Sequence, residues 1–136
     1  MDELRRGSVQ RLLRAAQDDL AGAQACLAAQ PPVYRLVAFL AQQAAEKHLK
    51  AWLVALGDDD LPFTHNLGEL VRLLADRGVA SPLPPLTLSA MSDFAVRPRY
   101  GLTDPDPDEA RQALSDATEV AWAAEAALRD LGALDQ

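Results

Sequence analysis

The feature that most constrains the fold of this chain is a stretch without glycine or proline that runs from Val33 to Leu56. It lies between two helix breakers, Pro31–Pro32 on one side and Gly57 on the other. As a helix it would be about 36 Å long, comparable to the diameter of a small domain. The stretch therefore predicts a central helix on which the rest of the chain packs.

Polar and apolar residues separate on opposite sides of this predicted helix. At the helical step the polar side chains fall within an arc of about 140°, and apolar side chains fill the remainder. An apolar arc this wide is more than one neighbouring helix covers, so the helix should pack on two sides. Two apolar residues, Phe39 and Leu53, fall inside the polar arc, where packing within one chain does not explain them. The polar arc consists of Arg35, Gln42, Gln43, Glu46, Lys47 and Lys50.

The segments before and after the central stretch also have helical periodicity. Apolar residues recur at three- and four-residue steps from Ser8 to about Ala29, which predicts a first helix antiparallel to the central one. Asn66 precedes an apolar stripe and Glu69 follows three residues later, so we predict a third helix opened by a capping box. Gly78 ends that helix.

The last third of the chain predicts a short helix and a long one. Apolar residues after the proline-rich stretch 81–85 predict a short helix that ends before Pro98. Asp106 followed by Pro107 predicts the start of a long final helix. No stretch alternates as a strand does, and no repeat or domain boundary interrupts the chain. The sequence thus predicts a single all-α domain over residues 1–136, an up-and-down bundle of four main helices plus a short fifth helix.

Composition excludes several classes of function. The chain has a net charge of −7 and an isoelectric point near 4.7, the wrong sign for a protein that binds DNA through its phosphates. Aromatic residues make up 5%, too few for a platform that stacks single-stranded bases. Cys26 is the only cysteine, so no intramolecular disulfide forms. Charges interrupt every apolar run, so neither a signal peptide nor a membrane span is predicted, and we expect a cytoplasmic protein.

The segment Arg97-Pro98-Arg99-Tyr100 has the densest functional chemistry in the sequence. Two guanidiniums on a proline-stiffened loop, next to a phenol, suit a phosphate or the carboxylate of a partner. The structural alternative is that Arg99 pairs with a buried acid such as Glu46 and that Tyr100 closes the end of the bundle. Both interpretations are open at this point.

The histidines and the acidic clusters favour structural roles. We expect His48 to be half-buried at the edge of the apolar arc, and His65 to form a hydrogen bond across the bundle end. The acids of Asp58–Asp60 predict a solvated turn, and those around Asp106 predict a helix cap. Glu46 lacks the Glu-x-x-His spacing of a di-iron bundle. No metal site, cofactor or catalytic residue is predicted.

Three segments together carry a family resemblance: AFLAQQAAEKHLKAWLVALG (Ala38–Gly57), FTHNLGELVRLL (Phe63–Leu74) and RPRYGL (Arg97–Leu102). In this order, and over the whole chain, the sequence resembles the HEPN domain family. The resemblance implies a bundle of four to five helices that is usually a homodimer. It also implies a gene often found beside a minimal nucleotidyltransferase, in prokaryotic toxin–antitoxin pairs.

Many HEPN proteins are metal-independent ribonucleases whose active site is an arginine and a histidine with four to six residues between them. For His48 that arginine would lie at positions 41–43, and for His65 at positions 58–60; neither range contains one. No histidine stands at the permitted positions after Arg97 or Arg99. The motif is absent, so the ribonuclease activity of the family should not be transferred to this chain.

The sequence therefore predicts a non-catalytic HEPN protein that acts as a dimeric binding module, with a nucleotide or a minimal nucleotidyltransferase as its candidate partner. The alternative is a divergent ribonuclease toxin in which the fold brings His65 close to Arg97 or Arg99. The predicted nucleotide- or partner-binding residues are Arg97, Arg99 and Tyr100, followed by His65, Lys47 and Lys50. The predicted dimer interface contains Phe39 and Leu53, on a face that should meet either a second protomer or a loop at the end of the bundle.

Overall fold

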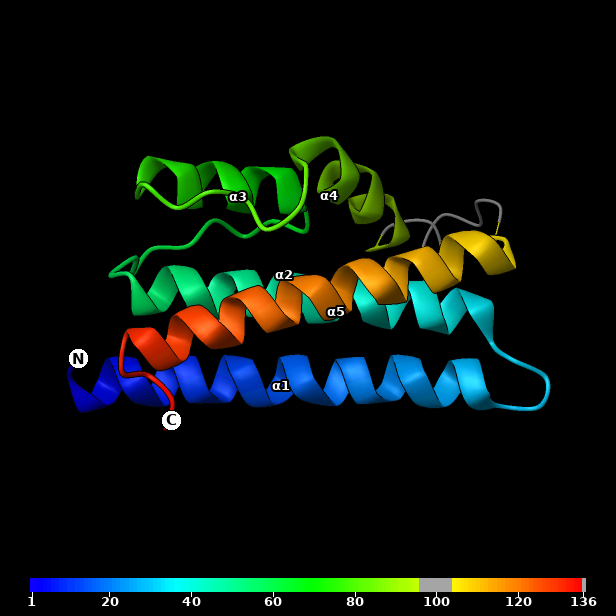
Figure 1. Ribbon diagram of the computed structural model, residues 1–136, viewed down its shortest axis with the longest axis horizontal. Coiled ribbons are helices and arrows are strands. Elements are labelled where there is room, and N and C mark those ends of the chain that lie inside the picture. The colour runs from blue at the N-terminus through cyan, green and yellow to red at the C-terminus, as the bar shows by residue number, and fades with distance from the viewer. Residues whose placement is uncertain (96–103, 136) are drawn as a thin grey trace.

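The computed structural model describes residues 1–95 and 104–135, and all secondary structure in that part of the chain is helical (Figure 1). The all-α class, with four main helices and a short fifth, is confirmed. The elements are α1 (Glu3–Ala28), α2 (Tyr34–Ala55), α3 (Leu67–Asp76), α4 (Pro85–Met91), the 3₁₀ turn η1 (Ser92–Ala95) and α5 (Pro107–Asp130). None of the described helices is long and apolar enough to cross a membrane.

The predicted starts of α3 and α5 hold, with one difference in the cap of α3, whereas α1 begins at Glu3, five residues before the predicted start at Ser8. Asp106 caps α5 in a full capping box, in which its Oδ1 accepts the amide of Glu109 at 2.7 Å and the Glu109 side chain accepts the Asp106 amide at 3.1 Å. Asn66 does cap α3, but its Oδ1 accepts the amide of Gly68 at 2.9 Å, and no reciprocal bond from Glu69 is found among the described residues. The expected capping box at α3 was therefore wrong, although the cap itself is confirmed.

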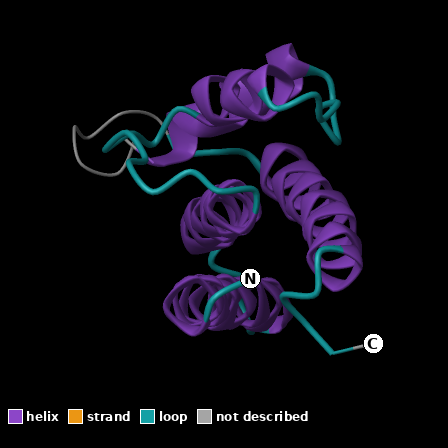
Figure 2. Ribbon diagram, turned by 90° about the vertical axis from the view of Figure 1, so that its left-hand side faces the viewer, coloured by secondary structure: helices purple, strands orange, loops and turns teal. Residues whose placement is uncertain are grey.

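The central position of α2 is confirmed. Figure 2 shows α2 in the middle of the bundle, with α1, α5 and α3 around it. The helices α1 and α2 form the expected antiparallel hairpin across Pro31–Pro32 (Figure 1). The helix α5 runs parallel to α2, since Arg111 near its start contacts Tyr34 and Glu125 near its end contacts His48.

The direction of α3 departs from a simple up-and-down order. The start of α3 lies beside the middle of α2, where the Gln42 amide donates to the carbonyl of His65 at 3.0 Å. The end of α3 lies beside the end of α2, where Arg77 donates to the carbonyl of Leu56 at 3.1 Å. The connection 57–66 crosses back along α2 before α3 begins, so α3 runs in the same direction as α2 (Figure 1).

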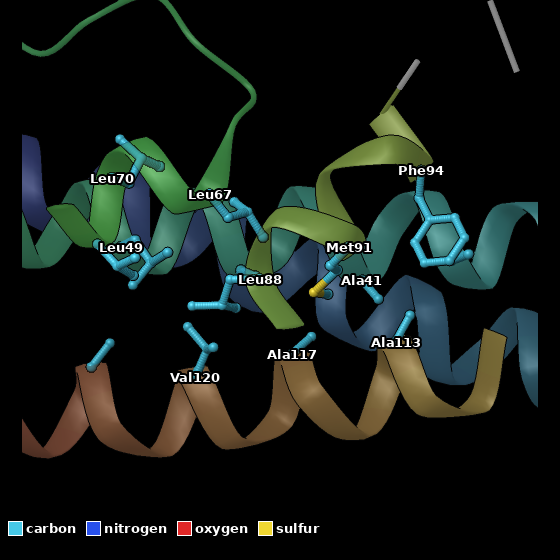
Figure 3. Close-up of a cluster of buried hydrophobic side chains, with 14 of the residues drawn as sticks. Ala41, Leu49, Leu67, Leu70, Leu88, Met91, Phe94, Ala113, Ala117 and Val120 are labelled. Carbon is cyan, nitrogen blue, oxygen red and sulfur yellow. The ribbon is translucent and has the colours of Figure 1, made fainter. Parts of the chain in front are cut away.

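The main core lies between α2, α3, α4 and α5. Leucines of α2, α3 and α4 meet small residues of α5, and Figure 3 shows Leu49, Leu67 and Leu88 gathered above Val120 and Ala117. Alanine dominates the facing side of α5, which allows the helices to approach closely. This packing places α4 and η1 beside α5, with a cavity between them.

Leu53 is part of this core, and its side chain has 0% exposed surface within the single chain. The expectation that a monomer does not explain Leu53 was therefore wrong. The connection 57–66 and α3 cover the side of α2 that the helical pattern assigned to solvent, so Leu53 is buried against its own chain. A fully buried side chain offers no area to a second protomer. Phe39 is partly exposed, and its place in a dimer interface stays a prediction.

Candidate functional site

The polar arc of α2 faces the interior of the fold at its centre. Gln42 has 0% and Glu46 5% exposed surface, so both are buried among the helices although their side chains are polar. A buried carboxylate is stable only when hydrogen-bond donors surround it. The contacts of Glu46 therefore decide what this part of the molecule can do.

Glu46 accepts three donors from its own chain. The Nδ1 atom of His65 lies 2.8 Å from Oε1, Nζ of Lys50 lies 3.0 Å from Oε2, and Nε2 of Gln42 lies 3.4 Å from Oε1. Lys50 brings a positive charge to the buried carboxylate, and His65 and Gln42 complete the set of polar contacts around it. The expectation that His65 forms a hydrogen bond across the bundle is confirmed.

Gln42 holds the backbone of the same histidine. Its Nε2 donates to the carbonyl of His65 at 3.0 Å, while its Oε1 accepts a hydrogen bond from the side-chain Nε2 of Gln43 at 2.6 Å. Glu46 thus contacts the ring of His65, and Gln42 bonds to its main chain. Its side chain has 33% exposed surface. The fold therefore presents one oriented imidazole edge to solvent.

The two predicted lysine contacts are engaged within the chain. Lys47 forms an ion pair of 2.5 Å with Asp19, which ties α2 to α1, and Lys50 forms the contact with Glu46. Both lysines are less than a third exposed at the side chain, at 29% and 17%. Their arrangement favours a structural role, and a role in binding a ligand stays a prediction for both.

His48 is more deeply buried than the sequence predicted. It was expected to be half-buried, yet its exposed surface is 0%. Its Nδ1 lies 2.9 Å from the carbonyl of Ala44, and its Nε2 lies 3.0 Å from Oε2 of Glu125 on α5. Both ring nitrogens face oxygens, so the buried ring makes a polar contact at each nitrogen. His48 therefore links α2 to α5 through a buried polar contact.

The predicted contacts Arg97, Arg99 and Tyr100 lie outside the described residues. The proposed pairing of Arg99 with Glu46, the nucleotide-binding role and the approach of either arginine to His65 are therefore untested predictions.

A cavity of about 320 Å³ lies between η1 and α5. Its floor is apolar, and Figure 3 shows Met91 and Phe94 reaching from α4 and η1 over Ala113 of α5. Its wall carries carboxylates of Asp93, Glu109 and Asp116. The remaining lining residues are Thr87, Ala90 and Gln112. Its volume is at the lower end of the range of roughly 300–1,000 Å³ typical of small-molecule sites, which suits a side chain or a small group.

A second cavity, of about 250 Å³, lies on the other side of Asp93, beside His65. It is lined by His65, Asn66, Ser89, Ser92 and Asp93. Asp93 therefore stands between two cavities, one reaching α5 and one reaching the start of α3. Of the two histidines, His65 is the one that lines a described cavity.

The start of α3 offers no free backbone donor to an anion in this second cavity. The amide of Leu67 donates to Oγ of Ser92 at 2.8 Å, and the amide of Gly68 donates to Asn66 at 2.9 Å. The next amide, that of Glu69, donates to the carbonyl of Asn66 at 3.2 Å. A phosphate at this helix end would compete with bonds already made.

Sequence reasoning missed Asp93 and Asp116. A signal for Asp116 was present, because it falls next to the apolar stripe of α5 that contains Ala113, Ala117 and Val120. An acid at such a position is buried, and Asp116 has 8% exposed surface. Asp93 has no comparable signal, since its place between two cavities arises from the packing of η1.

The comparisons with known proteins agree with the helical architecture. The family model of the HEPN domain matches residues 9–126, which is most of the chain. Neither the curated proteins nor the solved structures give a significant match. Since the family model covers α1 through most of α5, the chain belongs to the HEPN domain family.

Proposed function

We propose that this HEPN chain is a non-nucleolytic binding module, and that a protein partner docks on one face of α4 and η1. This docking face consists of Leu86, Ala90 and Asp93, which are all exposed and follow one another at helical spacing. The observation that carries the proposal is the position of Asp93 at the end of this stripe, between two cavities. A partner that covers the stripe would reach both cavities.

Leu86 supplies the apolar part of the proposed face. Its side chain is 85% exposed at the first turn of α4, and large apolar residues exposed in this way favour contacts with a partner. A stripe with an apolar anchor at one end and a charged group at the other resembles the composition of a protein interface more than that of a nucleotide site.

The burial and internal pairing of His48 support a non-nucleolytic role. His48 has 0% exposed surface and bonds to Glu125, so it cannot meet a substrate without opening the α2–α5 contact. The sequence also lacks the arginine that family ribonucleases place before the histidine, with four to six residues between the two. The resemblance to HEPN proteins makes a minimal nucleotidyltransferase the first partner to test, in a toxin–antitoxin pair with a homodimer of this chain.

The test is coexpression of the full chain with the protein encoded by the neighbouring gene, followed by gel filtration with light scattering. We expect a complex with wild type and its loss in Leu86→Asp. The matched control is Leu4→Asp, because Leu4 is a leucine of nearly equal exposure, 86% against 85%, on α1. A complex that both variants keep, or that both lose, would contradict the proposed face.

One observation favours the second candidate, a divergent ribonuclease. Glu46 orients the ring of His65 through Nδ1, and His65 lines a cavity with the hydroxyls of Ser89 and Ser92. A carboxylate that fixes an imidazole in this way is a common arrangement for a general base. Cleavage of RNA that depends on both His65 and Glu46 would support this candidate over the binding module.

A further inference from the structure

We infer that the cavity between η1 and α5 receives a cationic side chain, arginine or lysine, from the docked protein partner. The inference rests on the proposed binding function and names the chemistry that the partner would bring. The three charged residues that line the cavity, Asp93, Glu109 and Asp116, all carry carboxylates, and no basic residue of the described chain lines it. The electrostatic potential inside the cavity therefore favours a cation.

Asp116 has an oxygen that no side chain satisfies. Its Oδ1 accepts Nε2 of Gln112 at 2.9 Å, while its Oδ2 has no hydrogen-bond partner among the described residues. The residue has only 8% exposed surface. Every fully buried side-chain oxygen in the described residues has a hydrogen-bond partner. Because Oδ2 has none, this atom keeps some access to solvent. Asp116 also lines the cavity. A nine-tenths buried carboxylate with one open oxygen is a strong acceptor for a charged donor.

The apolar floor selects the kind of cation. Met91, Phe94 and Ala113 supply buried apolar surface to the lining of the cavity, beside the carboxylates. Arginine and lysine bury an aliphatic stem on apolar surface while the charged head meets acidic groups, which matches a cavity with an apolar floor and an acidic wall. In the described part of the chain no three metal-ligating side chains converge, so a bare metal ion finds fewer contacts here than an amphipathic side chain does.

The cavity lies where a docked segment would reach it. Ala90 and Asp93 belong both to the docking face and to the lining of the cavity. A partner residue beside Asp93 would extend its side chain over Met91 toward Asp116. The net charge of −7 on the chain favours the approach of a basic segment over an acidic one.

The probe is a blocked tripeptide with a central arginine, titrated to millimolar concentration into the isotope-labelled full chain. Amide chemical shifts report the binding site. We expect saturable shifts at Met91, Phe94 and Ala113. The same peptide with citrulline in place of arginine should give none, because citrulline keeps the shape and loses the charge. Equal binding of the citrulline peptide, or shifts that map to another surface, would overturn the inference.

Two variants test the carboxylates. Asp116→Asn keeps an oxygen for Gln112 and removes the charge, and we expect the dissociation constant of the arginine peptide to rise about tenfold or more. Asp93→Asn changes an exposed residue, so folding is not at risk, and it should weaken binding in the same direction. The control is Asp18→Asn, an equal change of charge on the exposed side of α1. Binding that neither cavity variant weakens would refute the role of the acids.

A last variant tests whether the cation in the cavity comes from a partner or from this chain. In Arg97→Ala/Arg99→Ala we expect unchanged affinity for the arginine peptide. A marked gain in affinity would assign the cavity to arginines of this chain and overturn the inference. The proposed function has a separate readout: a complex with the neighbouring protein that survives Asp116→Asn leaves the binding module intact and removes only the cationic contact.

Discussion

The Nδ1 atom of His65 lies 2.8 Å from Oε1 of Glu46, so a residue in the connection before α3 is bonded to the centre of α2. This contact joins two positions that are 19 residues apart in the chain. It fixes the start of α3 beside the middle of α2 and determines which side of His65 faces the solvent. The stability of the fold and the geometry of the cavity beside His65 both depend on it.

We predict that Glu46→Ala destabilises the chain by about 1–3 kcal/mol, because His65 and Lys50 lose their shared acceptor. Urea unfolding followed by circular dichroism measures the change. The control is Glu119→Ala, at an exposed position of α5, for which we expect a change within about 0.5 kcal/mol. Equal stability of the two variants would contradict a structural role for Glu46.

His48 and Glu125 should couple energetically across the α2–α5 contact. We predict that the double-mutant cycle of His48→Gln and Glu125→Gln gives a coupling energy of about 1 kcal/mol or more, since the ring of His48 is fully buried and its Nε2 faces the carboxylate. Thermal or chemical unfolding of the four proteins gives the value. Additive effects of the two substitutions would show that the contact contributes nothing of its own.

Leu53 and Phe39 should respond differently to substitution. Leu53→Ala should cost about 2–5 kcal/mol in unfolding free energy, because the side chain is fully buried in the core. Phe39→Asp should leave the helical content unchanged and convert a homodimer to a monomer in light scattering. A wild-type monomer, or a Phe39→Asp protein that stays dimeric, would remove Phe39 from the proposed interface.

Nucleotide binding through Arg97, Arg99 and Tyr100 can be measured directly. If the predicted role is right, calorimetry with ATP should show saturable binding to wild type and an affinity about tenfold or more lower for Arg99→Ala. Arg72→Ala, at an exposed position of α3, is the control. An absence of saturable heat with wild type would remove the nucleotide from the candidate partners.

Much of the fold could be predicted because local chemistry decides it. Pro31–Pro32 ends one helix, Gly57 follows another, and Asp106 caps a third, and each acts on the backbone near its own position. The direction of α3 could not be predicted, because the connection 57–66 is long enough either to turn at the end of α2 or to return along it.

The candidate site was predicted only in part, because burial depends on contacts between distant segments. The helical pattern of α2 placed Glu46 and Leu53 on its polar arc, and the return of the connection over that arc buries both. His65 was singled out from its place before α3, whereas Asp93 gains its role from two cavities, one between η1 and α5 and one beside the start of α3. Periodicity within one helix does not contain this information.

The most direct test of the central claim is an RNA cleavage assay with the purified full chain and a fluorescence-quenched single-stranded RNA. The control is His48→Gln/His65→Ala, which removes both imidazoles. A non-nucleolytic binding module predicts that wild type and this variant give the same rate as buffer. A rate for wild type that is clearly above buffer, and that is lost in the variant, would contradict the account and establish the chain as a ribonuclease.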